Sequence, residues 1–177
     1  MTRDIAFILD GRIGKKDLRA LAEWASIRLE NRNRLFELAF CDSGKISDNA
    51  LWCITHLKNS DAVWLQSLQD FFIDTLLKEN TTARRRMLFQ ILRDQEYHAD
   101  CIRVDFLDYC MSNINSECES YAIRCFSLYI AIKICRHYPE LLAELKERIG
   151  LLSHEPLSPG MRCAVRKVSD EIRALSV

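Results

Sequence analysis

Cysteine and histidine are the residues of this chain that could most readily do chemistry. Cys135-Arg136-His137 places a thiol, a cation and an imidazole side by side, and a nearby positive charge can activate a thiol as a nucleophile. Residues two apart on a helix point in different directions. We therefore expect a buried cysteine beside a surface histidine. His154-Glu155 is a weak acid–base candidate, because no nucleophile or substrate cradle accompanies it in the sequence.

The spacing of the eight cysteines does not match a metal site. The chain contains no CxxC, HxxxH or HExxH pattern, which are the spacings that hold zinc. Cys118 and Cys125 would share a helix face, where thiols packed against neighbouring helices are expected. The five glycines form neither GxGxxG nor GxxxxGK[ST]. We therefore expect no catalytic residue, no metal and no cofactor.

A cluster of cations is the best candidate for a binding site. Arg84-Arg85-Arg86 form a run, and Arg93 follows one or two helical turns later. Guanidinium groups recognise carboxylates and phosphates. The predicted basic patch comprises Arg84, Arg85, Arg86, Gln90, Arg93, Arg124 and Lys133. The alternative is a solvated helix face on which the arginines pair with acids such as Asp94 and Glu96.

Composition limits the classes of partner. Twenty-five basic residues balance twenty-five acidic ones, so no global positive field draws the chain onto nucleic acid. The apolar run from Ile5 to Leu9 is too short for a signal peptide, and no stretch approaches the 18 apolar residues of a membrane span. We therefore expect no membrane association, a cytoplasmic location and reduced thiols.

Helical periodicity dominates the chain from Lys15 onward, without a convincing alternating strand pattern. Ser47 or Asp48 is expected to cap one helix, and the apolar segment 116–136 is expected to be central. The predicted helices cover approximately residues 17–30, 32–41, 47–57, 61–78, 82–92, 100–112, 116–136, 139–150 and 161–175.

An apolar residue followed by arginine recurs near the start of alternate helices. The pairs are Leu18-Arg19, Ala83-Arg84, Ile123-Arg124 and Met161-Arg162, and Ala50-Leu51 stands at the corresponding place where arginine is missing. The steps between first members are 32, 33, 40 and 38 residues. Each step contains one further helix. Such a period indicates stacked helix pairs, which bury a continuous core only together.

These pairs resemble the HEAT and armadillo repeat families, in which a Val-Arg pair recurs near the start of one helix of each pair. The resemblance implies an all-α fold, a right-handed α-solenoid of about four stacked helix pairs plus a terminal helix. Residues 1–177 would form a single domain, with 1–44 a divergent N-terminal part and 45–177 the clearer repeats. A four-helix or irregular bundle is the alternative.

The resemblance implies a non-enzymatic scaffold or adaptor that binds another protein or peptide on its concave face. Helices that begin with the Val-Arg-like pair tend to line that face in such solenoids. The alternative is a nucleic-acid-binding HEAT-like protein, related in architecture to DNA alkylation-repair glycosylases. Those enzymes have a basic groove that combines an aspartate with aromatic residues. Trp24, Trp52 and Trp64 fit no such motif, and the balanced charge disfavours nucleic acid. The oligomeric state does not follow from the sequence.

Overall fold

The computed structural model describes residues 5–154 and 156–175, and these residues form helices joined by short connections, without a strand. The chain is therefore all-α, as predicted. Three short 3₁₀ turns lie at Asn59–Asp61 (η1), Ala99–Cys101 (η2) and Leu152–His154 (η3). The α-helices are α1 (Ile5–Asp10), α2 (Lys15–Ile27), α3 (Leu29–Ala39), α4 (Gly44–Ile54), α5 (Ala62–Gln66), α6 (Gln69–Lys78), α7 (Thr82–Arg93), α8 (Val104–Ile114), α9 (Tyr121–Cys135), α10 (Pro139–Leu151) and α11 (Pro159–Leu175).

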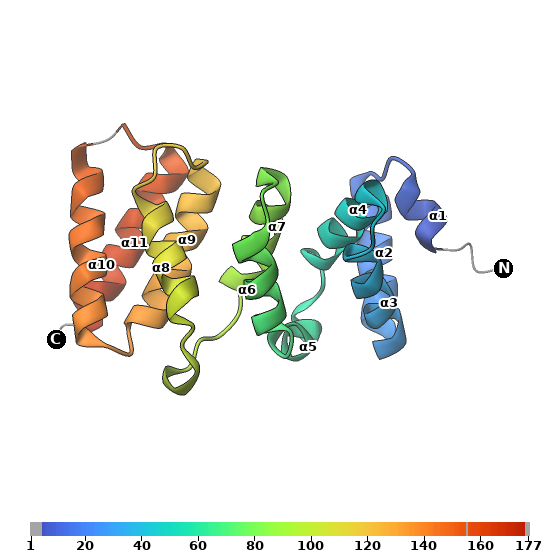
Figure 1. Cartoon of the computed structure of the whole chain (residues 1–177), viewed down its shortest axis with the longest axis horizontal. Helices are drawn as coiled ribbons and strands as arrows, with labels where there is room; N and C mark the ends of the chain where they lie inside the picture. The colour runs from blue at the N-terminus through green and yellow to red at the C-terminus, as the bar shows by residue number, and fades with distance from the viewer. Residues whose placement is uncertain (1–4, 155, 176–177) are drawn as a thin grey trace.

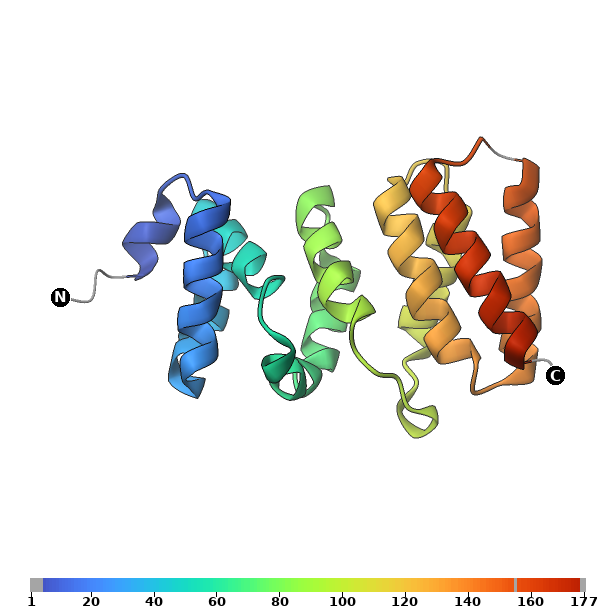
Figure 2. The same cartoon turned by 180° about the vertical axis from the view of Figure 1, so that it is seen from behind.

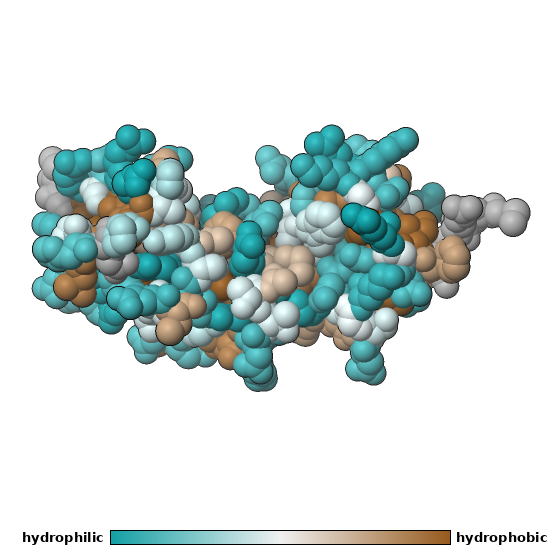
Figure 3. All heavy atoms as spheres, turned by 90° about the horizontal axis from the view of Figure 1, so that it is seen from above, coloured by the Kyte–Doolittle hydropathy of each residue, from teal (hydrophilic) through white to brown (hydrophobic). Residues whose placement is uncertain are grey.

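The helices lie in two layers along an elongated molecule, with α1 and α10 at opposite ends (Figures 1 and 2). In the first layer α4, α7, α9 and α11 pack each on the next. In the second layer α8 lies against α6 and α10. The layers are joined by the pairs α3–α4, α6–α7, α8–α9 and α10–α11, while α1 and α2 pack on α4. Seen from above, the outline is indented in the middle of one long side (Figure 3).

The core runs continuously between the two layers. Leu88, Phe89 and Leu92 of α7 are fully buried, as are Leu128 and Ile130 of α9. Helix α9 packs against α7, α8, α10 and α11, so the most apolar segment of the chain is central. Burying one such side chain contributes about 1.5–3 kcal/mol. None of the described helices is long and apolar enough to cross a membrane.

Local sequence explains several helix starts. The Ser120 side chain accepts a hydrogen bond from the backbone N–H of Ile123 at the start of α9, and Pro139 occupies the first turn of α10, where its missing N–H costs nothing. Helix α4 begins at Gly44, earlier than predicted. Ser47 therefore is no cap, and its hydroxyl instead donates to the carbonyl of Ala39 at 2.6 Å.

The predicted helix over 61–78 is broken into η1, α5 and α6. The Ser67 hydroxyl donates to the carbonyl of Trp64 at 2.7 Å, and such local bonds compete with helical backbone pairing. Beyond the break, Gln69 joins Gln66 in donating to the carbonyl of Glu96, each at 3.0 Å. The break therefore ties α5 and α6 to the segment that follows α7, and helical periodicity alone did not reveal it.

Candidate binding site

Arg84, the first arginine of the cluster, joins α7 to the preceding helix pair. Its guanidinium donates to the Ser47 hydroxyl and to Asp48, both at 2.9 Å, and to the carbonyl of Ala39 at 3.2 Å. Ala39 is the last residue of α3, where helix carbonyls lack intrahelical partners. Glu79 accepts from Arg84 Nε at 2.9 Å. Arg84 therefore supplies a hydrogen-bond donor to the end of α3 and bridges the helix pairs α3–α4 and α6–α7.

Arg124 and Lys133 play the same part farther along. Arg124 is only 3% exposed, and its Nε donates at 2.8 Å to the carbonyl of Ile114, the last residue of α8. The Lys133 ammonium donates to the carbonyls of Arg93 and Gln95 at 2.9 and 2.7 Å. Burial lowers the pKa of Lys133. Both cations lie at the negative end of a helix dipole, where positive charge is stabilising.

Arg85 and Arg93 pair with carboxylates. Arg85 donates to Glu119 at 2.6 Å and lies over the ring of Tyr109. Arg93 donates two hydrogen bonds to Asp94, of 2.8 and 3.0 Å. Asp94 is one of the acids that the alternative prediction, a solvated helix face, named as a partner. The side chain of Arg86 is exposed and forms no hydrogen bond or ion pair with any residue of the described ranges. Ligand binding by the seven residues stays a prediction, but the contacts give most of the cations a structural role.

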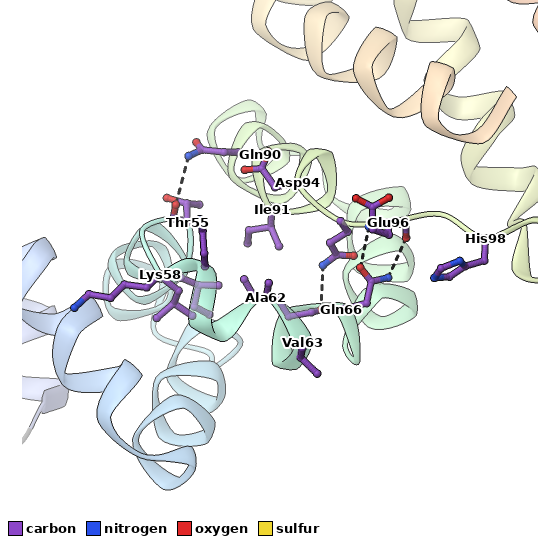
Figure 4. A pocket seen from close by; sticks show the side chains of 15 residues that line it. Thr55, Lys58, Ala62, Val63, Gln66, Gln90, Ile91, Asp94, Glu96 and His98 are labelled. Atoms are coloured by element: carbon purple, nitrogen blue, oxygen red, sulfur yellow. Dashed lines mark hydrogen bonds between the residues drawn. The ribbon is translucent and has the colours of Figure 1, made fainter. Parts of the chain in front are cut away.

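A pocket of about 450 Å³ lies where α4, α5 and the end of α7 meet (Figure 4). This volume falls within the usual range of ligand pockets. Ile91 of α7 and Ala62 of α5 point toward one another across it (Figure 4). We call it the anchor pocket. Its apolar lining is Ile54, Leu57, Ala62, Val63, Leu65 and Ile91, and its polar lining is Thr55, Lys58, Asn59, Gln66, Gln90, Asp94, Gln95, Glu96 and His98.

Glutamine amides hold the walls of the anchor pocket in place. Gln66 accepts from the backbone N–H of Glu96 at 2.9 Å and donates to its carbonyl at 3.0 Å (Figure 4). Gln95 donates to the carbonyl of Leu65 at 3.0 Å. On the opposite wall Gln90 donates to the carbonyl of Thr55 at 3.5 Å. These paired bonds join α5 to the segment after α7, so the pocket is built by fixed backbone.

A second hollow, of about 500 Å³, lies on the other side of the same helix end, between α7, α9 and α11. We call it the basic hollow. Arg136 pairs with Glu96 at 3.4 Å, whereas Lys167 is exposed and has no partner among the residues that the structure describes. Asp94 lines both hollows. The lining of the basic hollow is Arg93, Asp94, Tyr129, Ile132, Lys133, Arg136, Lys167 and Glu171.

The structure thus brings only part of the predicted patch together. Gln90, Arg93 and Lys133 surround the C-terminal end of α7. Arg84 lies nine residues before Arg93 on α7, which places it roughly 14 Å away along the helix axis. Lys167 and Arg136 were not among the predicted residues. Their contribution depends on how α11 packs against α9, and the repeat period does not determine that packing.

A family model for the HEAT repeat domain matches residues 6–172. The chain belongs to the HEAT repeat family. No curated protein and no solved structure matches the chain. The resemblance inferred from the apolar-Arg pairs is therefore confirmed. In this HEAT-repeat protein the arginines of two such pairs, Arg84 and Arg124, bond to the last carbonyl of a preceding helix.

The cysteine and histidine side chains considered above as reactive groups can be located in the part of the chain that the structure describes. Burial raises the pKa of Cys135 to about 12, so its thiol is protonated at neutral pH. A ring nitrogen of His137 lies 2.8 Å from the carbonyl of Tyr97. Cys118 is exposed and not packed as expected. Within residues 5–154 and 156–175 no three His, Cys, Asp or Glu side chains are grouped to hold a metal ion. Glu155 of the pair His154-Glu155 lies outside the described residues.

Proposed function

We propose that this HEAT-repeat protein is a non-enzymatic scaffold that binds a segment of another protein across the C-terminal end of α7. The anchor pocket takes an apolar side chain of that segment, and the basic hollow takes acidic side chains. One observation carries the proposal: two hollows of different chemistry flank one helix end and share Asp94. A buried anchor next to charged positions is the usual anatomy of a specific protein interface.

The first helix layer is the inner, concave side of the proposed solenoid. Helices α4, α7, α9 and α11 pack more closely on one another than α3, α6, α8 and α10 do, as expected on the inner side of a curved stack. The right-handed sense of the superhelix belongs to the same proposal. So does a reducing, cytoplasmic setting, which is supported by eight free thiols.

Charge favours a peptide over nucleic acid at this site. Most of the predicted cations are engaged with carbonyls or carboxylates of the chain itself. The acids Asp94 and Glu171 lie among the cations of the basic hollow and would repel a phosphate backbone. A peptide can place an acidic side chain against Lys167 and an apolar one in the anchor pocket, because it carries charge only at chosen side chains and not at every unit of its backbone.

Display of random peptides on the intact chain, followed by fluorescence anisotropy of the enriched peptides, tests this proposal. We expect peptides that combine a large apolar residue with acidic ones. Lys167→Glu should weaken their binding by about three- to tenfold, a loss of roughly 0.7–1.4 kcal/mol, because it reverses a free charge in the hollow. Ala62→Trp should also weaken binding, because its ring fills the anchor pocket.

Arg162→Glu is the matched control, since it reverses the charge of an exposed residue on the same helix, α11, outside both hollows. Binding to this variant should stay within about twofold of wild type. Circular dichroism verifies that each variant is folded. Enriched peptides that bind Lys167→Glu and Ala62→Trp as tightly as wild type would contradict the proposal. So would tighter binding of a DNA duplex than of any peptide at physiological salt.

A further inference from the structure

Another groove lies between α10 and α11. These two helices stand at the C-terminal end of the molecule (Figures 1 and 2). It consists of two neighbouring hollows of about 570 and 310 Å³, which share Lys146 and Ile172 in their linings. Its apolar lining includes Leu142, Ile149 and Leu175, and Leu175 is 46% exposed. We call it the end groove.

The end groove faces away from the rest of the stack. On α10, Arg148 donates to the carbonyl of Met111 in α8, so that side of α10 faces the preceding helix pair. Lys146 lies two residues earlier, which is roughly 200° around the helix. Leu142 and Ile149 are half-buried and Leu175 is exposed in the part of the chain that the structure describes. This apolar lining is therefore within reach of a partner.

The rim of the end groove is basic, although the chain has no net charge. Lys146 and Arg166 are exposed and form no hydrogen bond or ion pair with the described part of the chain. Arg173 is neutralised by an ion pair with Asp170, the one carboxylate of the lining. Two uncompensated cations above an apolar floor therefore select an occupant that is both acidic and apolar.

A second copy of this chain is a poor occupant on electrostatic grounds. Head-to-tail stacking would bring the α1–α2 end of one copy against the end groove of another. That end carries four exposed cations, Arg12, Lys15, Lys16 and Arg19, and three exposed acids, Asp10, Asp17 and Glu23. It therefore has no surplus of acidic side chains to match a basic rim. A different, acidic molecule complements the end groove better.

We propose that the end groove binds an acidic amphipathic helix of another protein. Helix α10 has 13 residues, so the groove beside it is roughly 20 Å long and accommodates about three to four turns of a partner helix. Apolar side chains at i, i+3 or i+4, and i+7 of that helix would lie on Leu142, Ile149 and Ile172. Glutamates beside this stripe would face Lys146 and Arg166. This surface does not depend on the partner proposed for α7.

A fluorescein-labelled synthetic helix of about 16 residues, with leucines in an i, i+3, i+7 stripe and flanking glutamates, is the probe. It should bind the full chain and lose about tenfold or more in affinity on the double change Lys146→Glu and Arg166→Glu. The double change Lys16→Glu and Arg19→Glu on α2 is the matched control, because it makes the same charge change at exposed positions outside the hollows described above. Binding to this control should stay within about twofold.

A second probe, in which lysines replace the glutamates, separates charge recognition from general stickiness. It should bind wild type more weakly than the acidic helix and bind the double variant better than wild type. Equal binding of the two probes, undiminished binding of the acidic helix to the double variant, or no binding of the acidic helix would overturn the proposal. Sedimentation velocity gives a further check. Concentration-dependent dimers that the double variant abolishes would assign the groove to a second copy instead.

Discussion

Asp61→Ala is expected to lower the free energy of unfolding by roughly 2–4 kcal/mol, because it removes the acceptor of a buried network. Asp61 is fully buried. It accepts hydrogen bonds from the Ser26 hydroxyl at 2.5 Å and from the backbone N–H of Lys58 at 3.2 Å, and it pairs with Arg32. These contacts join α2 and α3 to η1. Without the carboxylate, the guanidinium of Arg32 and the backbone N–H of Lys58 lose their acceptor, and the Ser26 hydroxyl keeps only the carbonyl of Ala22 at 3.0 Å.

Urea denaturation of the variant, followed by circular dichroism, measures this loss. Asp48→Ala is the matched control, since its carboxylate is about half exposed and pairs with Arg84. An ion pair of this kind contributes about 0–1 kcal/mol. Similar losses for the two variants would contradict the role assigned to the Asp61 network.

Arg124→Ala is expected to cost roughly 2–4 kcal/mol, because it leaves the carbonyl of Ile114 without its charged donor and opens a space in the core. For a chain of this length each kcal/mol lowers the melting temperature by about 2–4 °C. Differential scanning calorimetry should therefore show a fall of roughly 5–15 °C.

Arg162→Ala offers a control from within the repeat itself. Arg162 occupies the equivalent position in the pair Met161-Arg162, but it is exposed and donates to the carbonyl of Leu157 in the preceding loop. Its removal should cost about 1 kcal/mol or less. If Arg162→Ala were as destabilising as Arg124→Ala, burial of the guanidinium would not explain the effect.

Two of the repeated arginines of this chain tie helices together. Arg84 and Arg124 each reach back to the last residue of an earlier helix, Ala39 and Ile114 respectively. Those carbonyls lie at the negative end of a helix and have no intrahelical partner. A cation at the start of the next helix of the first layer supplies a missing donor at α7 and at α9. This accounts for the pairs at Arg84 and Arg124, whereas Arg162 of α11 bonds to a loop carbonyl.

Helix positions followed from the sequence where apolar spacing was regular. The segments predicted at 139–150 and 161–175 correspond closely to α10 and α11. The break at Ser67 was not predicted, because a side-chain bond to a nearby carbonyl leaves no trace in the apolar pattern. The anchor pocket depends on this break, so it too was beyond reach of periodicity.

The candidate site was predictable only in part. Gln90, Arg93 and Lys133 do line the two hollows. The partners of Arg84 and Arg85 lie between 5 and 45 residues away in the chain. Arg84, Arg124 and Lys133 each reach a backbone carbonyl. Carbonyls are present at every position, so residue types alone cannot reveal which ones a cation will reach. The division of the chain at residue 44 stays a prediction.

An NMR titration is the most direct test of partner binding at α7. Amide correlation spectra of the ¹⁵N-labelled chain would be recorded with increasing amounts of a peptide selected on the wild-type protein. The largest shift changes are expected in α5, at residues 90–98 and at residues 129–136, because these segments form the two hollows. Changes confined to α1–α3, or to the residues that line the end groove, would contradict binding across the end of α7.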